Sequence, residues 1–118
     1  MSVETARRVF ELSKKFPKEE RYSLTDQIRR SSRSVSGQIA EAWRRRKYEN
    51  VFVNKLNEAE GEAAETQVWL EYAVRCGYVS TKEGRELHRG YDKILGKLVN
   101  MGNNPKKWIL RKTTASRA

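Results

Sequence analysis

The chain has 118 residues and a formal net charge of +10, with 34% charged and 37% hydrophobic residues. This length allows one domain with a modest core, and the composition favours a soluble helical protein. The sequence contains no apolar run long enough to span a bilayer, no recognisable signal segment and a single cysteine, so we expect a cytoplasmic protein without membrane contact or an intrachain disulfide.

The charges are distributed unevenly along the chain. Residues 23–47 hold seven basic and two acidic residues, and residues 102–118 hold five basic residues and no acidic one. Residues 48–76 are acidic, with six carboxylates against two basic residues. This polarity predicts partners that are recognised through charge, either a polyanion or the acidic surface of a second protomer.

A loose apolar stripe predicts a first helix over residues 3–15. The stripe consists of Val3, Ala6, Val9, Phe10 and Phe16. Pro17 ends this helix, because the residue before a proline is kept out of helical angles.

The second predicted helix begins near Ser23, which we expect to be its N-cap. Its buried row is Leu24, Ile28, Ser31, Val35, Ile39 and Ala42. The hydroxyl of Ser31 needs a hydrogen-bond partner in that row. The helical wheel places Arg29, Arg33, Arg44 and Lys47 nearly opposite the row. This face is either a solvated basic surface or a binding surface, and the boundary with the next helix can lie anywhere from residue 44 to 50.

The third predicted helix, residues 48–76, is the longest element, at about 44 Å. A row with alternating steps of four and three residues predicts its buried face: Phe52, Leu56, Ala59, Ala63, Thr66, Leu70 and Ala73. A flanking row carries Glu58, Glu62, Glu65, Trp69 and Tyr72. Gly77 is a natural residue for the C-terminal end of this helix.

Ser80 and Glu83 have the spacing of a capping box and predict the start of a fourth helix. Its apolar row is Leu87, Tyr91, Ile94, Leu98 and Met101, widened by Leu95 and Val99. The sequence therefore predicts an all-α protein, an antiparallel up-down-up-down four-helix bundle over residues 1–105. Residues 106–118 form a basic tail that we expect to be largely disordered, with Trp108 and Ile109 as candidates for docking.

The sequence offers no catalytic constellation. His88 stands without a matching cluster of Cys or His, and no glycine-rich phosphate loop precedes a helix. We therefore expect no enzymatic activity, no metal and no cofactor.

Residues 16–43 carry a signature that resembles a known family. Its parts are the stretches Phe16-Pro17-Lys18-Glu19-Glu20-Arg21-Tyr22, Leu24-Thr25-Asp26-Gln27-Ile28-Arg29-Arg30-Ser31 and Ile39-Ala40-Glu41-Ala42. They are similar to the four-helix-bundle proteins named after open reading frames in 23S rRNA intervening sequences, and the similarity covers about residues 3–101. The resemblance implies a homopentamer. A related basic bundle, the accessory variability determinant of diversity-generating retroelements, implies a reverse transcriptase and nucleic acid as further partners.

Two functions stay open on these grounds. The first is a nucleic-acid-binding accessory protein that contacts the phosphates of RNA or DNA. The alternative is an oligomeric protein-interaction scaffold with no direct nucleic-acid role. Base stacking is not favoured, because Trp43 is the one aromatic residue interleaved with the basic residues of the second helix.

Candidate residues follow for both surfaces. The candidates for phosphate binding are Arg44, Arg45, Arg46, Arg85, Arg89, Lys93, Lys97, Lys106, Lys107, Arg111 and Lys112. The candidates for the oligomer interface are Arg29, Arg33, Glu58, Glu62, Glu65, Trp69 and Tyr72. In that interface we expect the arginines to pair with carboxylates of a neighbouring protomer, while the two aromatic side chains supply most of the binding energy.

Overall fold

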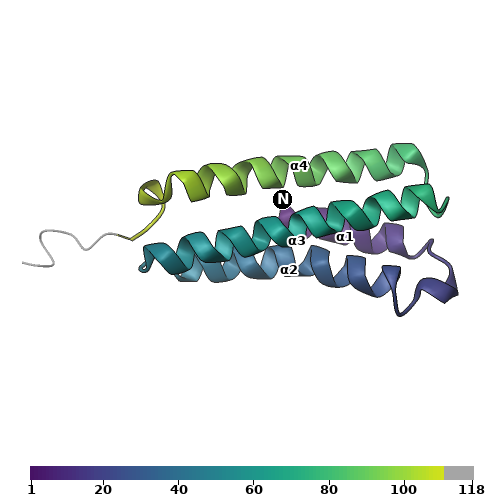
Figure 1. Ribbon diagram of the computed structural model, residues 1–118, viewed down its shortest axis with the longest axis horizontal. Coiled ribbons are helices and arrows are strands. Elements are labelled where there is room, and N and C mark those ends of the chain that lie inside the picture. Colours follow the sequence, from purple (N-terminus) through teal and green to yellow (C-terminus); the bar gives the residue numbers. More distant parts are fainter. Residues whose placement is uncertain (111–118) are drawn as a thin grey trace, which may run out of the picture.

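A computed structural model of the chain gives the architecture in Figure 1, and the structure describes residues 1–110. The elements in this range are α1 (Ser2–Ser13), η1 (Lys18–Glu20), α2 (Leu24–Arg44), α3 (Glu49–Arg75), α4 (Thr81–Asn103) and η2 (Pro105–Lys107), where η denotes a short 3-10 helix. The four α-helices run alternately in opposite directions (Figure 1), and no strand occurs among the described residues. The prediction of an all-α, antiparallel four-helix bundle is confirmed; residues 111–118 lie outside the described part of the chain.

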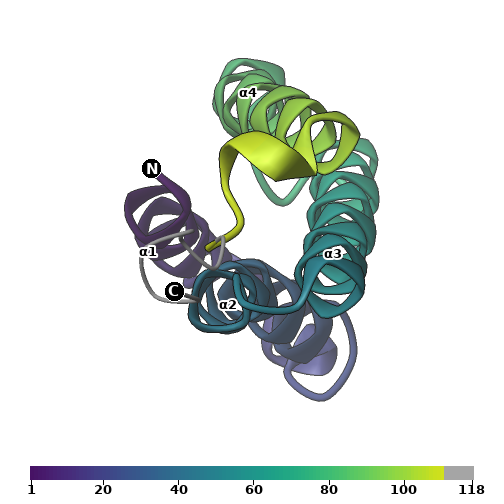
Figure 2. The same ribbon diagram turned by 90° about the vertical axis from the view of Figure 1, so that its left-hand side faces the viewer.

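Helix α3 is the central element, lying between α2 and α4 (Figure 2). Every residue of its predicted row is buried, and Phe52, Leu56, Ala59 and Ala63 have no exposed surface. Fully burying a side chain the size of Phe52 or Leu56 contributes about 1.5–3 kcal/mol relative to leaving it in water. The alanines of the row let the neighbouring backbones approach closely, so α2 and α4 both pack against this face of α3.

Helix α1 is short and lies beside the first part of α2 (Figure 1). Its buried residues Val9 and Leu12 belong to the common core, whereas Val3 is 70% exposed, so the prediction that Val3 packs in the apolar stripe is wrong. Contacts between α1 and α4 are partly ionic: Arg8 pairs with Glu86 at 3.2 Å, and Lys15 pairs with Glu83. Exposed ion pairs of this kind add little stability, so these two pairs hold α1 against α4 only weakly.

The segment after α4 contacts α3 and reaches the turn between α2 and α3. Figure 2 shows it crossing from the end of α4 toward α2. Ile109 packs against the core, and the Leu110 N–H donates to the Arg46 carbonyl at 2.8 Å. The predicted docking of Trp108 and Ile109 on the bundle is therefore present.

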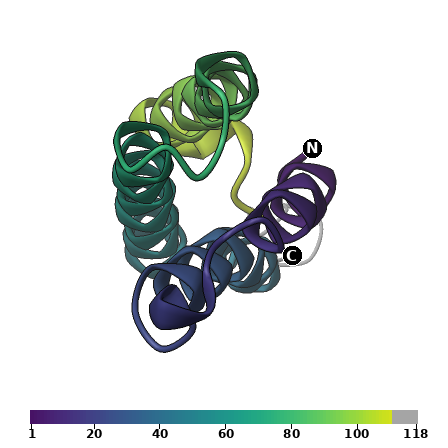
Figure 3. The ribbon, with the colours of Figure 1, turned by 90° about the vertical axis from the view of Figure 1, so that its right-hand side faces the viewer.

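The start of α2 differs from the prediction. Ser23 occupies the N-cap position, but its hydroxyl makes no capping bond; it donates instead to Glu20 Oε1 at 2.5 Å. The same carboxylate oxygen accepts the Leu24 N–H at 3.3 Å, so Glu20 of η1 caps the helix. The Tyr78 hydroxyl donates to the other Glu20 oxygen at 2.8 Å. This bond joins the α1–α2 and α3–α4 connections, which lie at the same end of the bundle; Figure 3 shows the backbone of that end. These bonds lower the pKa of Glu20 and raise the pKa of Tyr78 to about 12.

The connection between α3 and α4 follows the predicted chemistry. Gly77 has a positive φ of 75°, a conformation that favours glycine, and the Tyr78 N–H donates back to the Ala73 carbonyl at 2.9 Å. Ser80 and Glu83 form the predicted capping box at the start of α4. The row of α4 is buried from Leu87 to Leu98, but Val99 is 43% exposed and does not widen it.

Candidate nucleic-acid interface

The basic run after Trp43 forms the turn between α2 and α3. Arg44 ends α2, Arg45 is its C-cap residue, and Tyr48 is the N-cap residue of α3. The Arg45 N–H bonds the carbonyls of the last turn of α2, and the Tyr48 N–H bonds the Arg45 carbonyl at 3.0 Å. Positive side chains are favourable at the negative end of a helix dipole, which explains how a turn forms without glycine or proline.

An aromatic pair stabilises this turn from outside. The Arg46 guanidinium lies 3.7 Å from the centroid of the Trp43 ring, and its Nε donates to the Trp43 carbonyl at 2.9 Å. Trp108 meets Trp43 in an edge-on arrangement, with 6.2 Å between ring centroids and 60° between ring planes. Together with the bond from Leu110 to Arg46, this contact places η2 against the turn.

We call this surface the basic–aromatic end. It consists of Trp43, Arg44, Arg45, Arg46, Lys47, Tyr48, Lys106, Lys107 and Trp108. All of these except Arg46 are exposed, and within residues 1–110 none of its six cations forms an ion pair with a carboxylate. The end therefore combines uncompensated positive charge with aromatic surface, and it brings together five of the predicted phosphate-binding residues.

The predicted basic row of α4 is a separate surface. Arg85, Arg89, Lys93 and Lys97 are all exposed, and in the described part of the chain none of the four is in an ion pair. They are spaced along α4 rather than gathered at the basic–aromatic end, and Arg85 borders a groove between α3 and α4. The predicted sites Arg111 and Lys112 lie outside the described residues.

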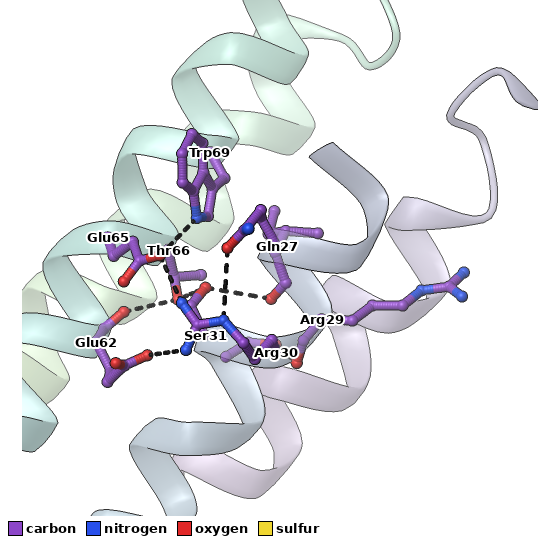
Figure 4. Close-up of polar contacts among 10 residues, drawn as sticks. Gln27, Arg29, Arg30, Ser31, Glu62, Glu65, Thr66 and Trp69 are labelled. Carbon is purple, nitrogen blue, oxygen red and sulfur yellow. Dashed lines mark hydrogen bonds and ion pairs between the residues drawn. The ribbon is translucent and has the colours of Figure 1, made fainter. Parts of the chain in front are cut away.

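The three α3 acids predicted for the oligomer interface are paired within the chain. Arg30 of α2 donates to Glu62 at 3.3 Å and to Glu65 at 2.6 Å, as Figure 4 shows. The two carboxylates raise the pKa of Arg30, with the bond to Glu65 as the main cause. Trp69 Nε1 also donates to Glu65 at 3.3 Å, and Lys55 pairs with Glu58 at 3.3 Å. Arg30 is not among the residues predicted for the oligomer interface, although it directly follows Arg29 on the same helix.

Arg33 is exposed, as predicted, whereas Arg29 is half-buried and bends back toward α1. Arg29 Nε donates to Ser13 Oγ at 2.7 Å, and its guanidinium lies 4.5 Å from the centroid of the Phe10 ring. Arg33 lies over the same ring at 5.3 Å. Figure 4 shows Arg29 on the side of α2 remote from the α3 acids. Both arginines therefore contact the Phe10 ring of α1. A helical wheel shows only where a side chain leaves its own helix, and a long arginine side chain can bend toward a ring on a neighbouring helix. Their pairing with acids of a second protomer stays a prediction.

A second aromatic surface lies at the opposite end of α3. Tyr22 is 84% exposed and Tyr72 is 54% exposed, and they border a groove of about 400 Å³ that Trp69 and Cys76 also line. The Trp69 and Tyr72 rings are 5.9 Å apart. The two predicted interface aromatics therefore share one surface, separate from the basic–aromatic end.

The described residues hold no group of three or more His, Cys, Asp or Glu side chains placed to bind a metal ion. Among the same residues, none of the helices has the length and apolar character needed to cross a membrane.

Comparison with known proteins gives a family and a fold relative. Residues 1–100 match the family described as 23S rRNA-intervening sequence protein. A crystal structure of a protein of unknown function, from the S23 ribosomal protein family of Bacteroides thetaiotaomicron, is 32% identical with a TM-score of 0.76 over 85% of this chain and 93% of that chain. No curated protein matches the sequence. The retroelement relation stays a prediction.

Proposed function

The chain belongs to the 23S rRNA-intervening sequence protein family, and on this premise we propose that it is a non-enzymatic protein that binds nucleic acid through phosphate contacts at its basic–aromatic end. The observation that carries the proposal is the gathering of six cations without carboxylate partners, within the described residues, on the α2–α3 turn and η2. Elsewhere in the bundle, cations such as Arg8 and Arg30 are paired with acids.

The chemistry of these side chains fits a phosphate backbone. A guanidinium offers a rigid fork of donors that matches phosphate oxygens, and Arg44 and Arg45 present it from an exposed turn. Each phosphate that is neutralised releases condensed counterions, so the affinity should fall steeply as salt rises. The row of Arg85, Arg89, Lys93 and Lys97 would extend the contact along α4 in the same sequence-independent way.

Self-association is the second part of the proposal. The exposed aromatic groove around Trp69 and Tyr72 supports an interface there, because buried aromatic anchors supply most of the energy of protein contacts. We expect a homo-oligomer, with five copies as the resemblance implies. Light scattering of wild type and of Tyr72→Ser tests this: the wild type should exceed 13.8 kDa several-fold and the variant should be smaller. A monomeric wild type at micromolar concentration would refute it.

A scaffold without nucleic-acid contact is the alternative function, and the same groove favours it. A reverse-transcriptase partner rests on the resemblance alone. A reverse-transcriptase gene beside the coding gene would support that partner, and placement within an rRNA gene would argue for the alternative.

The direct test is fluorescence anisotropy with labelled RNA and DNA over a range of salt concentrations. The variant Arg44→Gln/Arg45→Gln is compared with Lys18→Gln/Arg21→Gln, which removes the same charge from exposed residues at the opposite end. For a duplex, each lost phosphate contact should flatten the plot of log affinity against log salt by about 0.9. We expect the first variant to bind more weakly and to show a shallower dependence of log affinity on log salt, whereas the second should match the wild type in both. Equal losses in the two variants would show that net charge, not this surface, determines binding.

A further inference from the structure

Three aromatic side chains at the basic–aromatic end remain accessible. Trp43 is 44% exposed, Tyr48 is 57% exposed and Trp108 is 36% exposed. Large aromatic surface is costly to leave in water, and here it lies among cations that already suit a polyanion. Phosphate recognition alone does not need it, since phosphate oxygens are bound by donors and charge.

Anchoring of the C-terminal segment does not account for this exposure. Ile109 makes the inward apolar contact with the core, and the backbone bond from Leu110 to Arg46 holds the end of this segment against the α2–α3 turn. Trp108 lies outside this contact, against the edge of Trp43. Tyr48 has no part in either contact, yet it is the most exposed of the three rings.

On this surface the cations lie between the rings or next to them along the chain. Arg46 stacks on Trp43, with Arg44, Arg45 and Lys47 on the same turn. On the other segment, Lys106 and Lys107 directly precede Trp108. Aromatic platforms among backbone-binding cations are the combination that holds unpaired bases, because every base has a π face. A duplex keeps those faces stacked inside and presents mainly its phosphates and grooves.

We propose that the basic–aromatic end binds single-stranded nucleic acid in preference to duplex, with unpaired bases stacking on Trp43, Tyr48 and Trp108 while the neighbouring cations contact phosphates. The proposal rests on the proposed function and names its substrate class. It departs from the expectation that base stacking is not favoured, because the fold places Trp108 beside Trp43 although the two lie far apart in the sequence. RNA and DNA share this chemistry, and separate arms of the test distinguish them.

The test measures anisotropy with labelled oligo-U, oligo-dT and a hairpin duplex that carries the same number of phosphates. Stacking on one aromatic ring is expected to raise affinity for a single strand by about 5- to 150-fold. We therefore expect Tyr48→Ser to weaken oligo-U or oligo-dT binding within that range and to leave duplex binding within about twofold. Trp43→Leu should weaken single-strand binding within the same range and duplex binding as well, because the Trp43 ring also holds the Arg46 guanidinium. Serine is itself a favourable N-cap residue, so Tyr48→Ser should preserve the start of α3. Tyr22→Ser, at the exposed tyrosine of the opposite end, is the matched control and should change nothing.

Tryptophan fluorescence gives a second readout that does not depend on a loss of affinity. In a Trp69→Phe background the remaining tryptophans are Trp43 and Trp108, and saturating oligo-dT should quench their emission while the duplex should not. Salt-dependent binding with equal affinity for single strand and duplex, and no quenching, would overturn this inference and leave the proposed function standing. Failure to bind any of the three probes would overturn both.

Discussion

A hydroxyl pair buried between α2 and α3 allows a quantitative test of the packing. Ser31 Oγ and Thr66 Oγ1 are 2.8 Å apart, both residues have no exposed surface, and Thr66 Oγ1 also donates to the Glu62 carbonyl at 2.9 Å (Figure 4). Ser31 therefore donates to Thr66, and Ser31→Ala removes that donor at a net cost of about 1 kcal/mol. Thr66→Val keeps the shape but leaves Ser31 only a bond of 3.4 Å to the Ile28 carbonyl, so it should cost about 1–2 kcal/mol.

The double variant Ser31→Ala/Thr66→Val removes both hydroxyl groups, so no buried hydroxyl is left without its partner. Its cost should fall short of the sum of the single costs by about 1 kcal/mol, measured as free energies of unfolding in urea. Ser32→Ala is the matched control: Ser32 is buried on the same helix, but its hydroxyl donates to the Arg29 carbonyl of its own helix at 3.2 Å. Its effect should add to that of Thr66→Val. If the stability losses of Ser31→Ala and Thr66→Val also add, the hydrogen bond between α2 and α3 does not form in solution.

Three further predictions concern single positions. A Cβ at Gly84 would collide with Val74 Cγ2, so Gly84→Ala should cost about 1–3 kcal/mol in chemical unfolding, and adding Val74→Ala should restore most of it; no rescue would refute this close contact of α3 and α4. The pKa of Glu83 is lowered from 4.5 to about 2 by its ion pair and capping bonds, so its contribution to stability is present above about pH 4.5 and is lost as the pH falls toward 2. Unfolding measured across that window should depend less on pH in Glu83→Gln, and an unchanged dependence would contradict the assignment. Ala63→Glu puts a charge in a fully buried row and should cost several kcal/mol, whereas Glu62→Ala should keep the fold; equal losses by circular dichroism would show that the helical phase of α3 is wrong.

The parts of the fold that local patterns determine could be predicted from the sequence. The row from Phe52 to Ala73 is buried throughout because its spacing follows a helix face. The cap of α4 followed from the Ser80–Glu83 spacing, since a capping box closes within one turn. At α2 the same local rule failed, because Glu20 in the preceding 3-10 helix accepts both the Leu24 N–H and the Ser23 hydroxyl.

The parts of the candidate site that depend on tertiary contacts could not be predicted in this way. A helical wheel gives the direction of the Cα–Cβ bond but not the position of an arginine's guanidinium. The guanidinium of Arg29 therefore lies over the Phe10 ring of α1 rather than in solvent. Arg30, one position further, reached the α3 acids. The contact of Trp43 with Trp108 depends on α4 returning the chain to the α2–α3 turn, which no local spacing records.

The most direct test of the account is to map where nucleic acid binds on the folded chain. Isotope-labelled protein is titrated with oligo-dT while the backbone amide signals are followed by nuclear magnetic resonance. The account predicts that the largest shifts fall in residues 43–48 and 106–110, with smaller ones along the exposed side of α4. Shifts confined to the opposite end, around residues 18–23, or the absence of any shift at saturating oligo-dT, would contradict the claim that the basic–aromatic end is the binding surface.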